Sequence, residues 1–196
     1  AIYSLDNSLN LNQLHGKQLS YNNFNDIYAA LTISKSLPKD IGVVIIKHAN
    51  PCGVSILKNN LDSYKSALSC DPLSAFGGIV SCNFKVSKTI ALELNKVFFE
   101  VIIANGFEQK ALKILKVKKN LRLIDASKFS TNKTFQSRSF NGNTLLQTKD
   151  EKKFFKENFR LVSKKKPNRL QYENLLEKPE LSNILRHSKL ERKILF

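Results

Sequence analysis

The sequence lacks methionine and tryptophan entirely, and only seven glycines, five prolines and three cysteines occur among its 196 residues. No Gly- or Pro-rich linker divides the chain, and 42% of the residues are hydrophobic, which excludes a disordered chain and predicts a folded core. No apolar run of about 18 residues occurs, so we expect no membrane contact. The missing initiator methionine predicts a piece of a longer chain, and the first ten residues predict no signal peptide.

The few cysteines and histidines exclude several classes of site. Cys52, Cys70 and Cys82 show no CxxC spacing, and an odd number without a secretory signal indicates reduced thiols in a cytoplasmic protein. We expect Cys70 and Cys82 to be small buried side chains. HExxH, Walker A, GxGxxG and nucleophile-elbow motifs are absent, and His15 and His187 have no metal-ligand spacing, so no metal is predicted.

The formal net charge of +16 is concentrated in the second half of the chain. Residues 1–105 carry 9 lysines against 7 acidic residues, whereas residues 106–196 carry 23 basic against 9 acidic residues. Three interpretations are open: a nucleic-acid-binding surface, a surface that attracts anionic small molecules, or lysines on solvated helix faces. The basic runs KVKKN and SKKKPNR lack interleaved aromatics and match no nucleic-acid-binding motif, which favours the third interpretation.

Continuous apolar runs, typical of buried strands, alternate along the chain with apolar residues at helical spacing. This alternation predicts an α/β layered domain. We expect helices within residues 19–38, 59–70, 86–100 and 107–120. We expect strands within residues 41–48, 76–83, 101–104 and 121–125.

Capping and turn residues indicate where these elements begin. Asn25 or Asp26 is the expected N-cap of the first helix, and Ser87 is the expected N-cap of the third. An Asn-Gly pair predicts a hairpin over residues 135–148. Beyond it, residues 150–177 predict a short helix, a strand and the start of another helix.

The first candidate site lies in the run VVIIKHANPCG, residues 43–53, where an apolar strand ends on Lys47 and His48. The end of a buried parallel strand is where α/β sheets place ligands. Histidine can move a proton near neutral pH, and a neighbouring ammonium stabilises developing negative charge. Adjacent strand residues point to opposite faces, so both serve one site only where the strand ends, which Pro51 and Gly53 indicate. From spacing alone, the alternative remains open that Lys47 and His48 are ordinary polar residues where the strand leaves the core.

Two further stretches carry residues suited to a polar or planar ligand. In CDPLSAFGGIVSCN, Gly77 and Gly78 allow a ligand to approach the backbone closely, and Phe76 can stack on a planar ring. The alternative is a tight turn with Phe76 in the core. In GKQLSYNNFND, Ser, Asn and Tyr side chains at a helix start can bind a ligand or simply cap the helix.

Several stretches, in this order, together resemble the formyltransferase part of the bifunctional purine biosynthesis enzymes: QLHGKQLSYNNFND, KHANPCGVSI, ALSCDPLSAFGGIVSCN, KVKKNLRL and LVSKKKPN. That family couples phosphoribosylaminoimidazolecarboxamide (AICAR) formyltransferase to IMP cyclohydrolase. The resemblance implies an α/β fold with a layered mixed sheet flanked by helices, similar to cytidine deaminase without its zinc. It also implies transfer of a formyl group from 10-formyltetrahydrofolate to the 5-amino group of AICAR, in a cytoplasmic homodimer with shared active sites.

The same resemblance implies roles for individual residues. His48 is expected to accept the proton of the amino group, and Lys47 to stabilise the transition state. Other positions match substrate-site positions of the family. These are Asn23, Phe76, Gly77 and Glu100.

The sequence also departs from the family pattern. The cyclohydrolase part has no counterpart, and neither has the Arg-Tyr-Gly and Asn-Pro-His-Gln stretch that normally helps to hold the phosphate. We therefore expect residues 1–176 to be the N-terminal part of the formyltransferase domain, and residues 177–196 to be an off-pattern tail left by truncation or frameshift. Pro179 would break the helix expected there. The alternatives are a folded non-catalytic remnant and a basic nucleic-acid-binding module.

Overall fold

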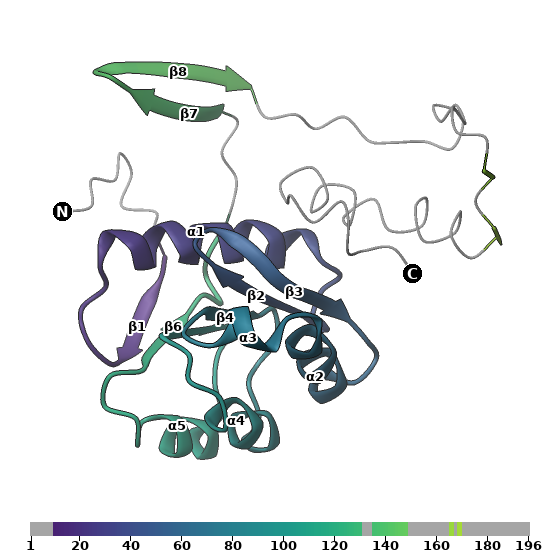
Figure 1. The fold of residues 1–196 in the computed structure, drawn as a ribbon. Helices are drawn as coiled ribbons and strands as arrows, with labels where there is room; N and C mark the ends of the chain where they lie inside the picture. Colours follow the sequence, from purple (N-terminus) through teal and green to yellow (C-terminus); the bar gives the residue numbers. More distant parts are fainter. Residues whose placement is uncertain (1–9, 131–134, 149–164, 167, 170–196) are drawn as a thin grey trace. The chain divides into compact units, whose positions relative to one another are not determined.

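The computed structural model describes residues 10–130, 135–148, 165–166 and 168–169. Residues 10–130 belong to one compact unit and residues 135–148 to another. The first unit contains a six-stranded sheet in the order β1-β6-β5-β4-β2-β3 (Figure 1). Its strands are β1 (Asn12–His15), β2 (Gly42–Lys47), β3 (Asn50–Ile56), β4 (Ile79–Cys82), β5 (Val101–Ala104) and β6 (Arg122–Asp125). Its helices are α1 (Tyr21–Ser36), α2 (Asn60–Cys70), α3 (Pro72–Ala75), α4 (Lys88–Asn95) and α5 (Gln109–Leu115).

The sheet is mixed. β4, β5 and β6 run parallel to one another, whereas β2 runs antiparallel to both of its neighbours, β3 and β4, and β1 runs antiparallel to β6. The predicted α/β architecture with a mixed sheet flanked by helices is confirmed. The assignment of β2 as a parallel strand is wrong, because β2 enters β3 through a two-residue turn, and such a turn joins only antiparallel strands.

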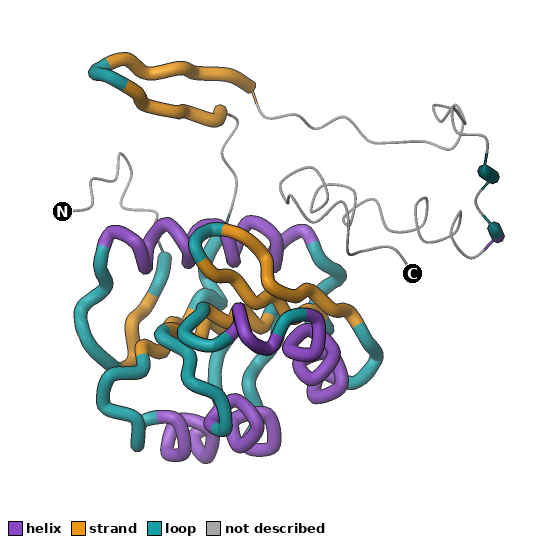
Figure 2. The backbone as a smooth tube through the Cα atoms, viewed as in Figure 1, coloured by secondary structure: helices purple, strands orange, loops and turns teal. Residues whose placement is uncertain are grey.

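Helices cover both faces of the sheet. Figures 1 and 2 show α1 across one face and α4 and α5 below the other, with the strands between them. Side chains alternate along a strand, so β2 presents Val43 and Ile45 to the core under α2 and α4, and Val44 and Ile46 to the face under α1. All four side chains are fully buried. The continuous apolar run therefore has the predicted cause, a strand covered on both faces.

Helix α1 begins earlier than predicted. Its N-cap is Ser20, whose hydroxyl accepts a hydrogen bond from the Asn23 N–H, while the Asn23 side chain accepts one from the Ser20 N–H. This reciprocal pair satisfies two backbone donors of the first turn. Asn25 and Asp26 therefore lie inside the helix, and the prediction that one of them is the cap is wrong. Ser87 caps α4 as predicted.

Three short or irregular elements, β1, β3 and α3, were not predicted. β3 was missed because Pro51 and Gly53 resemble turn residues. In the structure β3 is an edge strand, where proline is tolerated because no neighbouring strand needs its missing N–H. Gly53 is required by packing, because a Cβ there would collide with the carbonyl oxygen of Ala67 in α2.

The cysteines differ from one another in burial. Cys82 in β4 is buried as predicted, and this burial raises the pKa of its thiol to about 12. Cys70 is exposed, so the prediction that it is buried is wrong. It is the last residue of α2, beyond the buried side chains Tyr64 and Ala67 of that helix.

The second unit contains the predicted hairpin. β7 (Phe135–Phe140) pairs antiparallel with β8 (Asn143–Thr148), and Asn141 and Gly142 make the turn with positive φ angles of 45° and 77°. The further elements predicted over residues 150–177, and the tail 177–196, lie outside the described residues apart from 165–166 and 168–169. No helix in the described part of the chain is long and apolar enough to cross a membrane.

Candidate functional site

The turn between β2 and β3 carries the two residues predicted to be catalytic. Lys47 ends β2, and His48 and Ala49 form the turn, with φ angles of 53° and 57°. A non-glycine residue in this left-handed region costs about 1–2 kcal/mol. Two-residue hairpin turns of this kind favour Asn-Gly for that reason. The strand ends here as predicted, but His48 and Ala49 make the turn instead of the residues that follow.

Lys47 reaches from the turn to the start of β4. Because β2 and β4 are antiparallel, the last residue of β2 lies beside the residues that enter β4. The half-buried Lys47 places its Nζ 2.8 Å from the carbonyl oxygen of Phe76 and donates a hydrogen bond to it. The Phe76 ring is 60% exposed and lies against the ring of Phe98, with the ring centroids 5.3 Å apart. Phe76 is therefore not a core residue, and its ring remains accessible.

The two glycines after Phe76 have different structural reasons. Gly77 has a φ of 73°, and a Cβ there would only touch the Phe98 ring at 3.7 Å, so its conformation is what requires glycine. A Cβ at Gly78 would stand 2.7 Å from the carbonyl oxygen of Ile46, so glycine allows β4 to lie close to β2. The Gly77 N–H donates to the carbonyl oxygen of Phe98 at 2.8 Å, which fixes this loop against the residues that lead into β5.

Asn23 and Glu100 are in direct contact. Asn23 is buried in the first turn of α1, and its Nδ2 donates to Oε2 of Glu100 at 3.0 Å. Nη1 of Arg122 lies 3.8 Å from the same oxygen, and Nε of Arg122 donates to the carbonyl oxygen of Gln18 at 3.2 Å. The Glu100 side chain remains 45% exposed. Its carboxylate is thus held in one direction while it still faces solvent.

The sequence patterns did not identify two residues that contribute to this arrangement, Asp26 and Arg122. Oδ1 of Asp26 accepts a hydrogen bond from the Ala49 N–H at 2.7 Å, which ties α1 to the turn. Asp26 lies three residues after Asn23, and this spacing places the two side chains on one face of the helix. Arg122 is the first arginine in the chain, at the start of a strand. Helical spacing could have identified Asp26, whereas no sequence signal pairs Arg122 with Glu100.

A thiol lies close to the same turn. Burial raises the pKa of Cys52, as do the charges of Asp71 and Asp26, while the charge of Lys47 opposes them. The thiol therefore stays protonated near neutral pH and is a poor nucleophile. In the described part of the chain no three His, Cys, Asp or Glu side chains are grouped so that they could hold a metal ion.

All six predicted site residues lie at one end of the sheet, which we call the Lys47 end. It is formed by the C-terminal end of β2, the N-terminal ends of β4 and β5, and the start of α1. The Glu100 N–H donates to the carbonyl oxygen of Gly78 at 3.0 Å, so backbone and side-chain contacts connect Asn23 and Glu100 to Phe76 and Lys47. The site thus lies at the opposite end of the parallel strands from the one that the sequence argument invoked.

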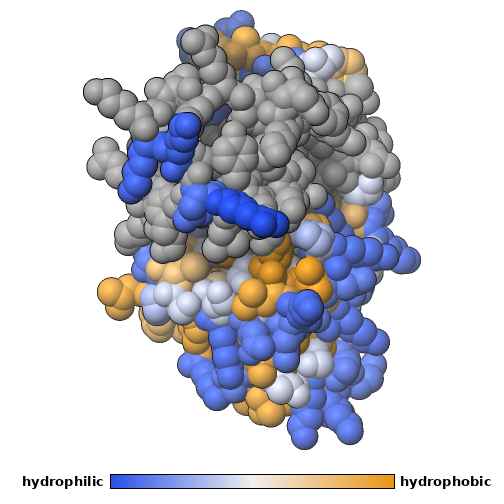
Figure 3. All heavy atoms as spheres, turned by 90° about the vertical axis from the view of Figure 1, so that its right-hand side faces the viewer, coloured by the Kyte–Doolittle hydropathy of each residue, from blue (hydrophilic) through white to orange (hydrophobic). Residues whose placement is uncertain are grey.

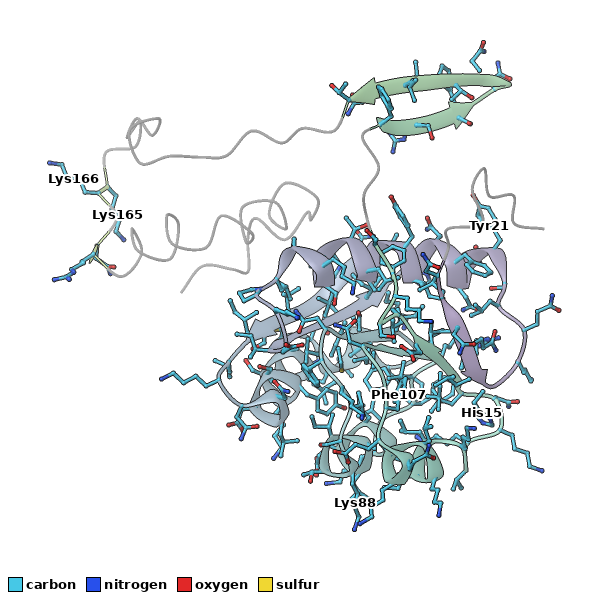
Figure 4. All side chains as sticks on the ribbon, turned by 180° about the vertical axis from the view of Figure 1, so that it is seen from behind. His15, Tyr21, Lys88, Phe107, Lys165 and Lys166 are labelled. Carbon is cyan, nitrogen blue, oxygen red and sulfur yellow. The ribbon has the colours of Figure 1, made fainter. Side chains whose placement is uncertain are left out.

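Two more residues flank the Lys47 end. Tyr21, the first residue of α1, is 87% exposed, and His15 ends β1; both are labelled on one side of the unit in Figure 4. Nε2 of His15 lies 3.2 Å from the carbonyl oxygen of Lys118. His15 therefore links β1 to the loop before β6, while Tyr21 presents its ring to solvent beside Asn23.

The lysines of α5 and of the following loop differ in what they do. In Figure 3 the lower part of the unit, which holds α4 and α5 in Figure 1, shows hydrophilic surface mixed with apolar patches. Lys113 in α5 and Lys116 just after it are exposed. Lys118 instead donates to the carbonyl oxygens of Asn95 at 2.6 Å and Val97 at 3.0 Å, and burial lowers its pKa. Lys118, in the basic run KVKKN, therefore stabilises the end of α4 and is not one of the solvated lysines of the third interpretation, whereas the exposed Lys113 and Lys116 agree with that interpretation.

Comparisons with known proteins agree with these motifs. Residues 1–183 match the model of the AICARFT/IMPCHase bienzyme family. The bifunctional purine biosynthesis protein PurH of Thermoanaerobacter sp. (strain X514) is 43% identical over 163 residues, which cover 83% of this chain and 32% of that protein. The PurH proteins of Acetivibrio thermocellus and Bacillus cereus (strain B4264) are 40% and 39% identical over 167 and 164 residues, 84% and 83% of this chain and 32% of each relative.

The chain thus spans about a third of the length of the curated relatives that it matches. The family model nevertheless covers most of the chain, and the relatives are named as bifunctional purine biosynthesis proteins. Both findings confirm the resemblance carried by the KHANPCG and DPLSAFGG motifs, and the chain therefore belongs to the AICARFT/IMPCHase bienzyme family.

Proposed function

We propose that the Lys47 end of the sheet is part of a formyltransferase active site of purine biosynthesis. The reaction transfers the formyl group of 10-formyltetrahydrofolate to the 5-amino group of AICAR. One observation carries the proposal: the six residues implied by the family resemblance, which lie up to 77 positions apart in the sequence, form one connected set. Family membership alone supports a role in purine biosynthesis, and the reaction is argued from the site.

The chemistry of the acceptor explains why a lysine and a histidine are needed together. The 5-amino group is a poor nucleophile, because its lone pair is delocalised into the imidazole and the carboxamide. His48 is exposed on the turn and accepts the proton that this amine loses. Lys47 places a positive charge next to it and stabilises the negative charge that develops on the formyl oxygen.

The surroundings direct these two groups. An ammonium has three N–H donors, and Lys47 uses one of them on the Phe76 carbonyl oxygen, which fixes its direction and leaves donors for a ligand. The hydrogen bond between Asn23 and Glu100 fixes the orientation of the amide and the carboxylate, which then contact the polar groups of AICAR. The exposed Phe76 ring offers a face for a planar ring of either substrate.

We also propose that the chain acts as a cytoplasmic homodimer with no membrane partner and with sites shared between subunits. Large apolar side chains at the Lys47 end support a subunit contact there: Leu73 is 89% exposed, Phe76 60% and Phe98 48%. Analytical ultracentrifugation tests this proposal. A monomer at concentrations well above those of the binding experiments would contradict it.

Calorimetric titration with AICAR tests the site. The double variant Lys47→Ala/His48→Ala is expected to bind AICAR at least about tenfold more weakly than the wild type, since it loses a charged donor and a ring. The matched control is Lys39→Ala, which removes an exposed lysine from the segment before β2, at the other end of that strand. An equal loss of AICAR affinity in the control, or an unchanged affinity in the double variant, would contradict the assignment of the site.

A formyl-transfer assay tests the reaction. Turnover is measured for this chain and for a fusion that adds the corresponding downstream part of the Thermoanaerobacter protein. Formyl transfer by either one, abolished in both by the Lys47→Ala/His48→Ala change, supports the proposal. Saturable AICAR binding without turnover in either would indicate a folded non-catalytic remnant. Salt-dependent retention of nucleic acid without AICAR binding would indicate the basic nucleic-acid-binding module instead.

A further inference from the structure

The turn that presents His48 adopts a conformation that its own residues disfavour. Both His48 and Ala49 carry a Cβ, and both lie in the left-handed region that glycine and asparagine occupy readily. Such residues persist where the surrounding structure imposes the conformation on them. The contacts made by the turn therefore decide how Lys47 and His48 are presented.

Contacts on both sides hold this turn. Within the hairpin, Nδ2 of Asn50 donates to the carbonyl oxygen of His48 at 2.8 Å. From outside, the half-buried Asp26 carboxylate accepts the Ala49 N–H at 2.7 Å, across 23 residues of sequence. A hydrogen bond from a backbone N–H to a carboxylate is stronger than one to a neutral acceptor. The contact from α1 is thus the strong tie between the turn and the rest of the site.

The same face of α1 also holds the carboxylate of the site. Asn23 donates to Glu100 at 3.0 Å, one helical turn before Asp26. The first two turns of α1 therefore fix two groups from different parts of the chain, the Glu100 carboxylate just before β5 and the His48–Ala49 turn between β2 and β3. A displacement of this helix would therefore disturb the positions of both groups.

We propose that Asp26 is a positioning residue that holds the His48–Ala49 turn and thereby aims Lys47 and His48 at the acceptor substrate. The inference rests on the proposed function, because the substrate is the one named there. Asp26 acts here through the backbone of Ala49, without touching the substrate. This distinguishes it from a substrate-binding carboxylate such as the one proposed for Glu100.

Four variants separate these roles by AICAR calorimetry. Asp26→Ala removes the acceptor and is expected to weaken AICAR binding by about tenfold or more, because small misplacements of reacting groups are costly. Asp26→Asn keeps an oxygen that can accept the Ala49 N–H and retains most of the affinity. Asp26→Ala/Ala49→Gly regains most of the lost affinity, since glycine adopts the turn without help. Asn25→Ala, an exposed neighbour on the same helix, leaves binding unchanged.

The double variant is the decisive one. If Asp26 contacts the substrate directly, Ala49→Gly rescues nothing, and the proposal is overturned. It is equally overturned if Asp26→Ala folds and binds AICAR like the wild type. Thermal unfolding of each variant shows whether it folds, and should Asp26→Ala fail to fold, the comparison of Asp26→Asn with the wild type decides, with loss of affinity contradicting the proposal.

Backbone NMR makes the result independent of the proposed function. The Ala49 amide proton is expected to move upfield in Asp26→Ala and to stay near its wild-type position in Asn25→Ala, because a hydrogen bond to a carboxylate deshields the proton. The His48 ring signals are expected to shift with it. Unchanged Ala49 and His48 signals in Asp26→Ala would refute the positioning role even if the wild type binds no AICAR. Shifted signals without any AICAR binding by the wild type would refute the proposed function alone.

Discussion

Replacing Gly53 by alanine tests how closely β3 packs on α2. The added Cβ would stand well inside 3.0 Å of the Ala67 carbonyl oxygen, a separation that real Cβ atoms essentially never show. Since the colliding atom belongs to the helix backbone, no side-chain rotation can relieve the contact. Either α2 or β3 must move, and such a movement opens the packing of Tyr64 and Ala67 against the core.

The expected cost follows from this geometry. Overpacking a well-packed interior costs about 1–3 kcal/mol, and a collision between two backbones lies at the upper end of that range. For a chain of this length about 3 kcal/mol lowers Tm by roughly 6–12 °C. Thermal unfolding followed by far-ultraviolet circular dichroism measures the change.

Ser55→Ala is the matched control, because it places the same alanine two residues further along the same strand without adding an atom. Ser55 is buried, and its substitution is expected to change the free energy of unfolding by less than about 1 kcal/mol. A Tm for Gly53→Ala within the error of the Ser55→Ala value would refute the close approach of β3 and α2.

Three further predictions concern other parts of the same unit. Ala49→Gly should stabilise the protein by about 1 kcal/mol, because glycine removes the cost of a positive φ, and an unchanged or lower denaturation midpoint would contradict this. Asn83→Ala should destabilise the protein by about 3 kcal/mol, because it leaves the buried Gly42 N–H without its acceptor at 2.7 Å. Urea denaturation measures the change, and a decrease in the free energy of unfolding of less than about 1 kcal/mol would contradict this prediction. Burial raises the pKa of the Cys82 thiol from 9.0 in the unfolded chain to about 12 in the folded protein, so the unfolded state loses its proton first and stability should fall as pH rises from 9 to 12. This fall should be shallower in Cys82→Ala, and Ellman's reagent at pH 8 should react quickly with the exposed Cys70 and slowly with Cys82 in the native protein.

Local patterns in the sequence predicted the buried elements well. The apolar run before Lys47 predicts a strand covered on both faces, and the structure has one there. Ser87 predicts the start of α4, because a cap depends on neighbouring residues alone. The Asn141-Gly142 pair predicts the β7–β8 turn for the same reason.

Features that depend on distant residues were not predicted. Rules based on neighbouring residues predict a turn at Pro51 and Gly53. In the structure both residues are accommodated in β3, because β3 lies at the edge of the sheet and α2 packs closely against Gly53. The predicted direction of β2 was wrong, because the turn at His48 and Ala49 contains no glycine and the usual sequence signal of a hairpin is therefore missing. The tie between Asp26 and Ala49 joins residues from two elements, and no spacing rule covers it.

The edge strand β3 also bears on how copies of this chain can meet. An exposed edge normally offers unpaired N–H and C=O groups to a strand from another molecule. Pro51 has no N–H to offer, and the register between β2 and β3 shifts at Ile45 and Ile46, a bulge that increases the local twist. The opposite edge, β1, is only four residues long and irregular in register. Neither edge strand of the described sheet is therefore well suited to pair with a strand of another molecule. Aggregation by strand pairing is disfavoured, and copies of the chain are expected to associate through side-chain surfaces instead.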